Sequence, residues 1–358
     1  MKRRRPGQEE RVQAEQAQVQ MRAEPVRVGS GRIWSVRRGV LRSGTGRGRG
    51  YLRRRPGYAV LAALLVAAVG SGCAAGTDSR TATGAGQGAK ALAGQPGGPA
   101  GNAGAAGTRA AQAEKARLAQ AARAVAAKKW GLASTPLAAP VPPAVKPHIT
   151  TRKGFEVEGG DDSLPPVFTT VPTDKKIVFL TMDDGDDKDP ELLRMMSDLN
   201  IPYSAFLSDY LVSDDYGYFK DAQSRGVTLN NHTLNHRYLP GLSYGEQKQE
   251  ICDQQDIIEK QYGERPRLFR PPYGNYNGDT LRIAKSCGIT AVPLWSEEAF
   301  PDHMEWREED QDLHPGDIIL THFRGKKDWK GSMPDLVRAV MKVVTDKGYA
   351  VARLEDYV

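Results

Sequence analysis

The amino-acid sequence predicts an α/β fold built around a mainly parallel sheet. Short apolar runs alternate with helical patterns from about residue 172 onward, as expected for strands joined by crossover helices. About seven of these runs are typical of strands, which favours a closed or nearly closed β/α barrel over an open sheet. The expected strands cover residues 177–181, 203–207, 227–230, 267–270, 290–294, 317–320 and 350–353.

Capping residues between these runs predict where helices begin. Asp189 precedes a proline, the pattern of an N-cap followed by the first helical position. Ser243 and Glu246 have the spacing of a capping box. Asp279 is the expected N-cap of the next helix, and a further helix is expected over residues 332–347.

The positive charge of the chain belongs to its N-terminal arm. Residues 1–58 carry 16 Lys and Arg against 4 Asp and Glu, a net of +12, while the whole chain carries +7, so the remaining 300 residues carry −5. A nucleic-acid partner for the folded part therefore loses its main support. Residues 1–52 are expected to be a disordered arm or to result from a misassigned start.

Residues 53–73 are expected to form an export signal. Three arginines precede the uncharged apolar stretch 58–69, and small residues follow up to Cys73. This pattern resembles a bacterial lipoprotein signal, in which Cys73 is lipidated and becomes the mature N-terminus. An uncleaved membrane anchor is the alternative. In either case we expect an exported protein, either lipid-anchored at the cell membrane and facing the cell wall, or secreted.

Residues 74–171 are predicted to be a low-complexity linker. Residues 74–108 are mostly Ala, Gly, Ser, Thr and Gln and bury too little apolar surface to fold. Residues 109–129 are alanine-rich and suit a lone helix, and residues 134–147 form a stiffer Pro/Ala spacer. The folded domain is therefore expected over residues 172–358.

Two adjacent carboxylates follow the first expected strand. Asp183 and Asp184 end the run KIVFLTMDDG, at the end of the strand where a parallel barrel builds its active site. Neighbouring carboxylates repel each other, which favours a positive group beside them. An acidic turn after a strand is the alternative.

His232 and His236 lie four residues apart after the third expected strand. On a helical turn both imidazoles would face one cation, although exposed histidines with this spacing are also common. Together with Asp184 they give two histidines and one carboxylate. This set suits Zn²⁺, and also Co²⁺, Mn²⁺ or Fe²⁺.

Two further motifs follow later strands. Arg270 opens RPPYG and offers a planar donor for a carboxylate, while the prolines stiffen the loop so that backbone N–H groups near Tyr273 can face an oxyanion. His322 ends LTH. Alone, it would be a core histidine, but beside a metal and a base it supplies the missing acid.

The order TMDDG, HTLNH, RPPYG, LTH resembles the polysaccharide deacetylase family, carbohydrate esterase family 4, with its NodB-homology domain. The resemblance covers about residues 172–358 and implies a distorted (β/α)7 barrel, similar to a TIM barrel. It implies that Asp183 is the base, that Arg270 positions this base, and that His322 is the acid. The metal ligands that it implies are Asp184, His232 and His236.

The sequence departs from the family at several places, one of which is Met182 where an aromatic residue is usual. The Asp-Trp motif that tunes the acid and lines the acetyl pocket has no clean match, although residues 295–300 and 305–306 approach it. Trp295 is expected to be a pocket wall, and the carboxylate partner of His322 is left open. Asp186 stands where proline is common.

Cys252 and Cys287 lie in two consecutive expected helices of an exported domain. A disulfide between them is expected, with two free buried thiols as the alternative.

The resemblance implies a metal-dependent hydrolase of linear amides. It would remove N-acetyl groups from an N-acetylglucosamine-containing envelope polysaccharide, with peptidoglycan the first candidate and chitooligosaccharides the second. The expected partners are this glycan and, through the lipid anchor, the membrane, and the protein is expected to be a monomer. An O-acetyl glycan esterase and a non-catalytic glycan-binding lipoprotein are alternatives. An iron oxygenase would leave Asp183, Arg270 and His322 without roles.

Overall fold

The computed structural model describes residues 102–358, with side chains from Ala110 onward. The predicted arm, the export signal with Cys73 and the start of the linker lie outside the described residues. No helix within residues 102–358 combines the length and the apolar character that crossing a membrane requires.

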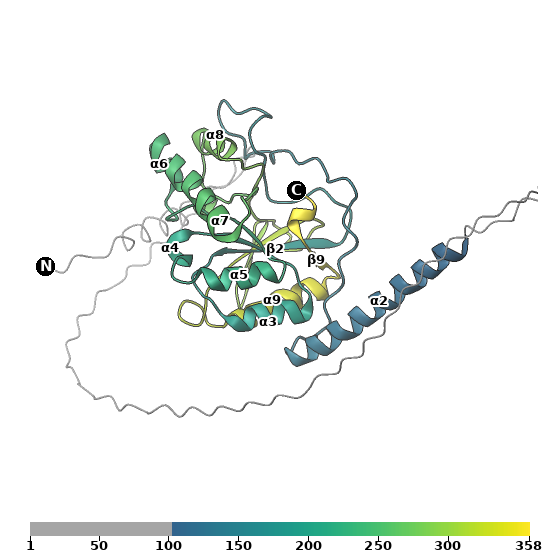
Figure 1. Ribbon diagram of the computed structural model, residues 1–358. Coiled ribbons are helices and arrows are strands. Elements are labelled where there is room, and N and C mark those ends of the chain that lie inside the picture. The colour runs from purple at the N-terminus through teal and green to yellow at the C-terminus, as the bar shows by residue number, and fades with distance from the viewer. Residues whose placement is uncertain (1–101) are drawn as a thin grey trace, which may run out of the picture. The chain divides into compact units, whose positions relative to one another are not determined.

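A seven-stranded sheet forms the centre of the domain (Figure 1). Its strand order is β4-β3-β2-β8-β6-β7, and β9 also pairs with β2. All pairings are parallel except that of β6 with β7, so the predicted α/β class is confirmed. The strands are β2 (Ile177–Asp184), β3 (Ser204–Leu207), β4 (Thr228–Asn231), β6 (Glu297–Ala299), β7 (Met304–Trp306), β8 (Ile318–His322) and β9 (Ala350–Ala352).

A second, two-stranded sheet pairs β1 (Val167–Phe168) with β5 (Val292–Pro293). Isolated parallel bridges join Asn231 to Phe269 and Leu268 to Ala291. The predicted strand over 267–270 thus contributes bridges rather than a strand of its own. A third, antiparallel bridge joins Thr170, after β1, to Asp317, before β8, so bridges connect the small sheet of the described residues to the large one through both of its strands. Closure into a barrel stays a prediction. β1 lies inside the segment predicted as linker.

The β6–β7 hairpin is absent from the prediction. Its strands are only three residues long and contain three glutamates. They therefore lack the apolar run by which a buried strand is recognised.

Both faces of β2 are buried, and alternate residues fill two different cores. Val178, Leu180 and Met182 pack with residues of the helices α3 (Pro190–Leu199) and α9 (Met333–Asp346), while Ile177 and Phe179 belong to the other cluster. This arrangement follows from the two-residue period of a strand. It removes the end of β2 from water and so fixes the surroundings of the carboxylates that follow.

Helices cover the sheet on both sides: α3 and α9 lie together on one side, and α6, α7 and α8 lie on the other (Figure 1). The predicted caps of Asp189 and Ser243 are present. The prediction that Asp279 is the N-cap of α8 is wrong. The N-cap is Asn277, because its Oδ1 accepts the N–H of Thr280 at 3.0 Å. The helices are α2 (Asn102–Lys129), α3 (Pro190–Leu199), α4 (Asp209–Val212), α5 (Tyr216–Ser224), α6 (Tyr244–Lys248), α7 (Gln254–Tyr262), α8 (Gly278–Ser286) and α9 (Met333–Asp346).

The C-terminal end of α2 is anchored to α3, although the sequence predicted a helix with little to pack. Arg123 Nε donates to the carbonyl of Leu199 at 3.2 Å. Lys129 Nζ and Trp130 Nε1 both donate to Asp198 Oδ2, at 2.6 and 2.8 Å. Hydrogen bonds of this kind explain how an alanine-rich helix holds its place against the domain.

A disulfide joins Cys252, in a π-helical turn at Gln249–Asp253, to Cys287 at the end of α8. Their Cα atoms lie 5.3 Å apart, and 35 residues separate them.

We predict that the double variant Cys252→Ser/Cys287→Ser loses about 3–4 kcal/mol of unfolding free energy, because the open chain gains entropy in the unfolded state. Urea denaturation measures this loss, and an unchanged midpoint would contradict it.

A buried carboxyl group at the start of β6 makes stability depend on pH. Glu297 is 1% exposed, and its Oε2 has no hydrogen-bond partner in the described part of the chain. Burial, with the nearby Asp317, raises the pKa of Glu297 to about 10. The folded protein therefore keeps a proton that the unfolded chain releases above its ordinary pKa of about 4.3.

The stability contributed by this proton is present below the unfolded pKa and is lost as the pH rises toward 10. We predict that Glu297→Gln, which stays neutral, becomes progressively more stable than the native protein between pH 5 and pH 9. Denaturation midpoints at pH 5, 7 and 9 test this, with the exposed Glu309→Gln as the matched control. Parallel curves for Glu297→Gln and the native chain would contradict the prediction.

Candidate active site

Asp183 and Asp184 occupy the C-terminal end of β2, and both are 2% exposed. Gly185 follows with φ 92°, and a Cβ there would lie 2.4 Å from a side-chain carbon of Val212. Only glycine therefore permits this turn without displacing the core. The turn holds both carboxylates at the edge of the sheet where the predicted motifs meet.

Arg270 pairs with Asp183 inside the protein. Its NH1 lies 2.7 Å from Asp183 Oδ1, and the arginine is 0% exposed. The other donors of the guanidinium reach Thr181 Oγ1 at 2.9 Å and the carbonyls of Pro293 and Leu294 at 2.9 and 3.2 Å. These four hydrogen bonds hold the guanidinium in one position, and so fix the orientation of the Asp183 carboxylate.

His232, His236 and Asp184 form a compact cluster. Asp184 Oδ1 lies 3.7 Å from His232 Nε2 and 3.5 Å from His236 Nε2, and it has no hydrogen-bond partner among the described residues. The opposite ring nitrogens contact the Arg270 carbonyl at 2.7 Å and Tyr273 Oη at 3.2 Å. Candidate ligand atoms of the three residues all lie within 4.8 Å of one another. Two neutral imidazoles and one carboxylate oxygen without a partner fit a divalent cation.

The prediction that the histidines share a helical turn is wrong. They lie on a loop after β4, in which Thr233 has φ 70° and His236 φ 53°. Asn231 Oδ1 accepts the Thr233 N–H at 2.8 Å, so the chain turns instead of winding into a helix. The rings nevertheless meet, with their centroids 4.8 Å apart.

His322 ends β8 and stands in register with Asp183 on β2. Its Nδ1 lies 3.5 Å from Oε1 of Glu298, whose side chain is 11% exposed. Glu298 is therefore the carboxylate that the sequence left open. The sequence could not identify it, because its position depends on the unpredicted strand β6, which pairs with β8.

Burial sets the protonation of the cluster. It lowers the pKa of His232 to about 4 and that of His236 to about 3, so both imidazoles are neutral at pH 7. Burial raises the pKa of Asp183 to about 6, although Arg270 opposes this. Burial would also raise the pKa of Asp184, but the surrounding histidines and Arg324 hold it well below its usual range.

Arg324 is a site residue that the sequence analysis missed. Its NH2 lies 2.6 Å from Asp184 Oδ2, and its NH1 lies 3.7 Å from Oδ2 of Asp186, the residue that departs from the family motif. Arg324 thus occupies one oxygen of Asp184 and leaves the other facing the histidines. The feature of the sequence that could have identified Arg324 is its position two residues after His322.

One cavity of about 500 Å³ is lined by the side chains with proposed chemistry, which are Asp183, Asp184, His232, His236, Glu298, His322 and Arg324. Tyr273 and Trp295 line it as well, whereas Arg270 and Asp186 do not. The Arg307 guanidinium lies 4.5 Å from the Trp295 ring centre, and a Cβ on Gly274 would come within 3.1 Å of that ring. The indole is therefore held firmly against the pocket.

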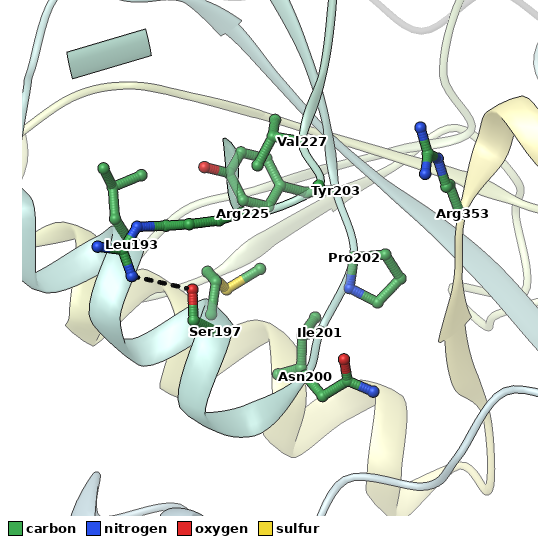
Figure 2. A pocket seen from close by; sticks show the side chains of 11 residues that line it. Leu193, Ser197, Asn200, Ile201, Pro202, Tyr203, Arg225, Val227 and Arg353 are labelled. Atoms are coloured by element: carbon green, nitrogen blue, oxygen red, sulfur yellow. Dashed lines mark hydrogen bonds between the residues drawn. The ribbon is translucent and has the colours of Figure 1, made fainter. Parts of the chain in front are cut away.

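A second cavity, of about 510 Å³, lies at the opposite ends of the strands (Figure 2). Tyr203 and Val227 line it and directly precede β3 and β4, and Arg225 reaches Ser197 Oγ there at 3.4 Å. None of the residues with predicted chemistry lies in it. Parallel α/β folds place catalysis at the C-terminal strand ends, so the first cavity is the candidate active site.

Comparisons with known proteins point to one family. The sequence profile of the polysaccharide deacetylase family matches residues 170–292. An uncharacterized Streptomyces coelicolor protein, SCO4760, is 37% identical over 54% of this chain and 78% of its own length. A Bacillus cereus peptidoglycan-N-acetylglucosamine deacetylase is 30% identical over 43% of this chain and 76% of its own.

Among solved structures, the Bc1960 peptidoglycan N-acetylglucosamine deacetylase aligns with a TM-score of 0.47 at 24% identity, covering 53% of this chain and 91% of that one. The matched profile covers β2, β3, β4 and the loop after β4, and so includes the Asp183–Asp184 and His232–His236 motifs. The chain therefore belongs to the polysaccharide deacetylase family, carbohydrate esterase family 4, and is a hydrolase of that family.

Proposed function

We propose that this protein removes N-acetyl groups from an N-acetylglucosamine-containing polysaccharide of the cell envelope, with peptidoglycan the first candidate. One observation carries the proposal. A carboxylate held by a buried arginine, a cluster suited to a metal ion and a carboxylate-paired histidine meet in one cavity. The relative named as a peptidoglycan-N-acetylglucosamine deacetylase supports this choice of substrate.

Asp184, His232 and His236 would hold the ion, for which Zn²⁺ is our first choice and Co²⁺, Mn²⁺ or Fe²⁺ are alternatives. A bound divalent ion would polarise the acetamide carbonyl and lower the pKa of a water molecule. The hydrogen bonds at the far ring nitrogens turn both Nε2 atoms toward the same point. Arg324 limits Asp184 to its free oxygen.

Asp183 is the proposed base. Arg270 engages its Oδ1, while its Oδ2 lies 3.6 Å from His232 Nε2 and so faces the metal cluster. From this position Oδ2 takes a proton from the attacking water. Arg270 keeps the accepting oxygen aimed at the cluster throughout, because three further hydrogen bonds hold its guanidinium inside the protein.

His322 is the proposed acid, and Glu298 is the residue that orients it. Once the carbonyl carbon has been attacked, His322 donates a proton to the departing sugar amine. The backbone N–H near Tyr273 would stabilise the oxyanion, and Trp295 would enclose the acetyl methyl group. Breaking the C–N bond then yields acetate and a free amine on the sugar.

We further propose that the enzyme works outside the cytoplasm as a monomer, tethered through lipidated Cys73 and the linker, or secreted. The export signal and the long Ala/Gly/Pro-rich segment support this placement. A tether of this kind would let the domain reach cell-wall glycan from the membrane.

The metal assignment predicts a loss of affinity when a ligand is removed. His236→Ala should weaken Zn²⁺ binding by at least about 100-fold, because one of the three proposed ligand atoms is lost. Competition against a chromophoric chelator measures this affinity. His303→Ala changes a histidine of the same cavity that lies outside the cluster and serves as the control. Equal weakening in both variants would contradict the assignment.

The catalytic assignment predicts separate effects on turnover and on metal content. We expect His322→Ala to abolish acetate release while bound zinc is retained. Glu298→Gln should lower kcat by about 10–100-fold and shift the pH profile, because the imidazolium loses its carboxylate. Acetate is measured with peptidoglycan, N-acetylglucosamine oligomers and acetylated xylan as substrates.

The choice of substrates separates the alternatives. Release from xylan alone would favour an O-acetyl esterase. No release from any substrate by the zinc-loaded native chain would favour a non-catalytic glycan-binding protein. Full activity in His322→Ala would remove this histidine as the acid.

A further inference from the structure

We propose that Glu250 is a positioning residue for the metal site, because it holds the loop between His232 and His236 in the shape that brings both rings to one ion. Glu250 is 3% exposed and lies in the π-helical turn Gln249–Asp253, between α6 and α7 (Figure 1). It acts through the backbone of the loop and is not itself a ligand. This role rests on the metal site of the proposed function.

Glu250 binds the loop directly before His236. Its Oε2 accepts the backbone N–H of Asn235 at 2.8 Å, and its Oε1 accepts the Asn235 Nδ2 at 3.0 Å. Its backbone carbonyl accepts the N–H of Leu234 at 2.9 Å. Hydrogen bonds to a carboxylate are among the stronger ones in proteins. One buried residue therefore fixes the two positions that lead into His236.

The same turn also holds the start of the loop. Asn231, directly before His232, donates from Nδ2 to the Ile251 carbonyl at 2.9 Å and to Gln255 Oε1 at 3.0 Å. A π-helical turn departs from regular α-helical hydrogen bonding, and such turns are frequent at functional sites. Here the carbonyls of Glu250 and Ile251 accept hydrogen bonds from the two ends of the loop. The turn thus sets the position of both histidines.

The turn is itself anchored to the domain on two sides. The disulfide joins Cys252, within the turn, to Cys287 at the end of α8. Gln254, directly after the turn, donates from Nε2 to the carbonyl of Leu207 at 2.7 Å, and Leu207 ends β3. Glu250 is therefore fixed relative to the sheet before an ion binds.

The loop needs this support because its backbone is strained. Thr233 has φ 70° and His236 φ 53°, a region that residues other than glycine rarely occupy. Such conformations persist only where the surroundings enforce them. Without the Glu250 carboxylate we expect the backbone at 234–236 to relax, which moves His236 Nε2 from its position 3.5 Å from Asp184 Oδ1. Partners that orient metal ligands typically contribute about 10- to 100-fold to metal affinity.

The test measures Zn²⁺ affinity of the full chain by competition against a chromophoric chelator. Glu250→Ala should weaken binding about 10- to 100-fold. Glu250→Gln should stay within about threefold of the native chain, because its amide oxygen accepts the Asn235 N–H and its NH2 group donates to Asn235 Oδ1 once that amide turns over. Asp253→Ala, which removes an exposed carboxylate of the same turn, is the matched control and should keep native affinity.

Two further measurements separate positioning from stability. Val340→Ala, at a buried position of α9, lowers stability away from the turn, and its folded fraction should keep native zinc affinity. In zinc-free protein, the amides of Leu234 and Asn235 should exchange hydrogen faster in Glu250→Ala than in the native chain. If Glu250→Ala does not fold, the exposed Asn235→Ala decides, because it removes one donor and should weaken zinc binding about three- to tenfold.

Native zinc affinity in folded Glu250→Ala, or in Asn235→Ala where Glu250→Ala is unfolded, would overturn the positioning role. A loss in Glu250→Gln as large as that in Glu250→Ala would overturn it as well, because the hydrogen bonds would then not be its cause. His236→Ala distinguishes the two failures. If it also keeps native affinity, the metal site itself is wrong, whereas if it alone loses zinc, only the role of Glu250 fails.

Discussion

The buried ion pair between Asp183 and Arg270 is the constraint on which the site depends. Arg270 is inaccessible to water, and its guanidinium joins β2 to the carbonyls at residues 293 and 294, while its own carbonyl orients His232. One residue therefore connects three segments that are distant in sequence and positions both a base and a ligand. Removing one partner of such a pair leaves a buried charge uncompensated and typically costs about 3–5 kcal/mol. The same ion pair therefore contributes to the stability of the fold and to the position of the proposed base.

The second carboxylate, that of Asp184, contacts different groups at its two oxygens. Arg324 engages one oxygen of Asp184, and two histidines that burial keeps neutral face the other. Backbone strain accumulates at the same place: Asp184, Thr233, His236 and Tyr273 all have positive φ. Strain of this kind persists only where the surrounding structure enforces it, and it is common at functional sites. An ion between these groups would take up the oxygen of Asp184 that has no hydrogen-bond partner among the described residues, so the arrangement supports the proposed metal-assisted amide hydrolysis.

The sequence predicted the parts of the fold that depend on local pattern. Apolar period and capping residues located β2, α3 and α6. Motif order grouped Arg270, which pairs with Asp183 but does not line the cavity, with five residues that do line it: Asp183, Asp184, His232, His236 and His322. The sequence did not predict the residues whose positions depend on contacts between segments distant in sequence. The hairpin that carries Glu298 is short and polar, the histidine loop is shaped by the Asn231 side chain, and Arg324 acquires its role only by folding back on Asp184.

Anomalous X-ray scattering from crystals of the zinc-loaded protein would show whether Asp184, His232 and His236 hold a metal ion, because it locates the ion without relying on turnover. We expect one zinc peak about 2.0–2.2 Å from Nε2 of His232, Nε2 of His236 and Oδ1 of Asp184. We also expect Arg324 to remain on the other oxygen of Asp184. If no peak is found at zinc saturation, or if other residues hold the ion, this metal site is wrong.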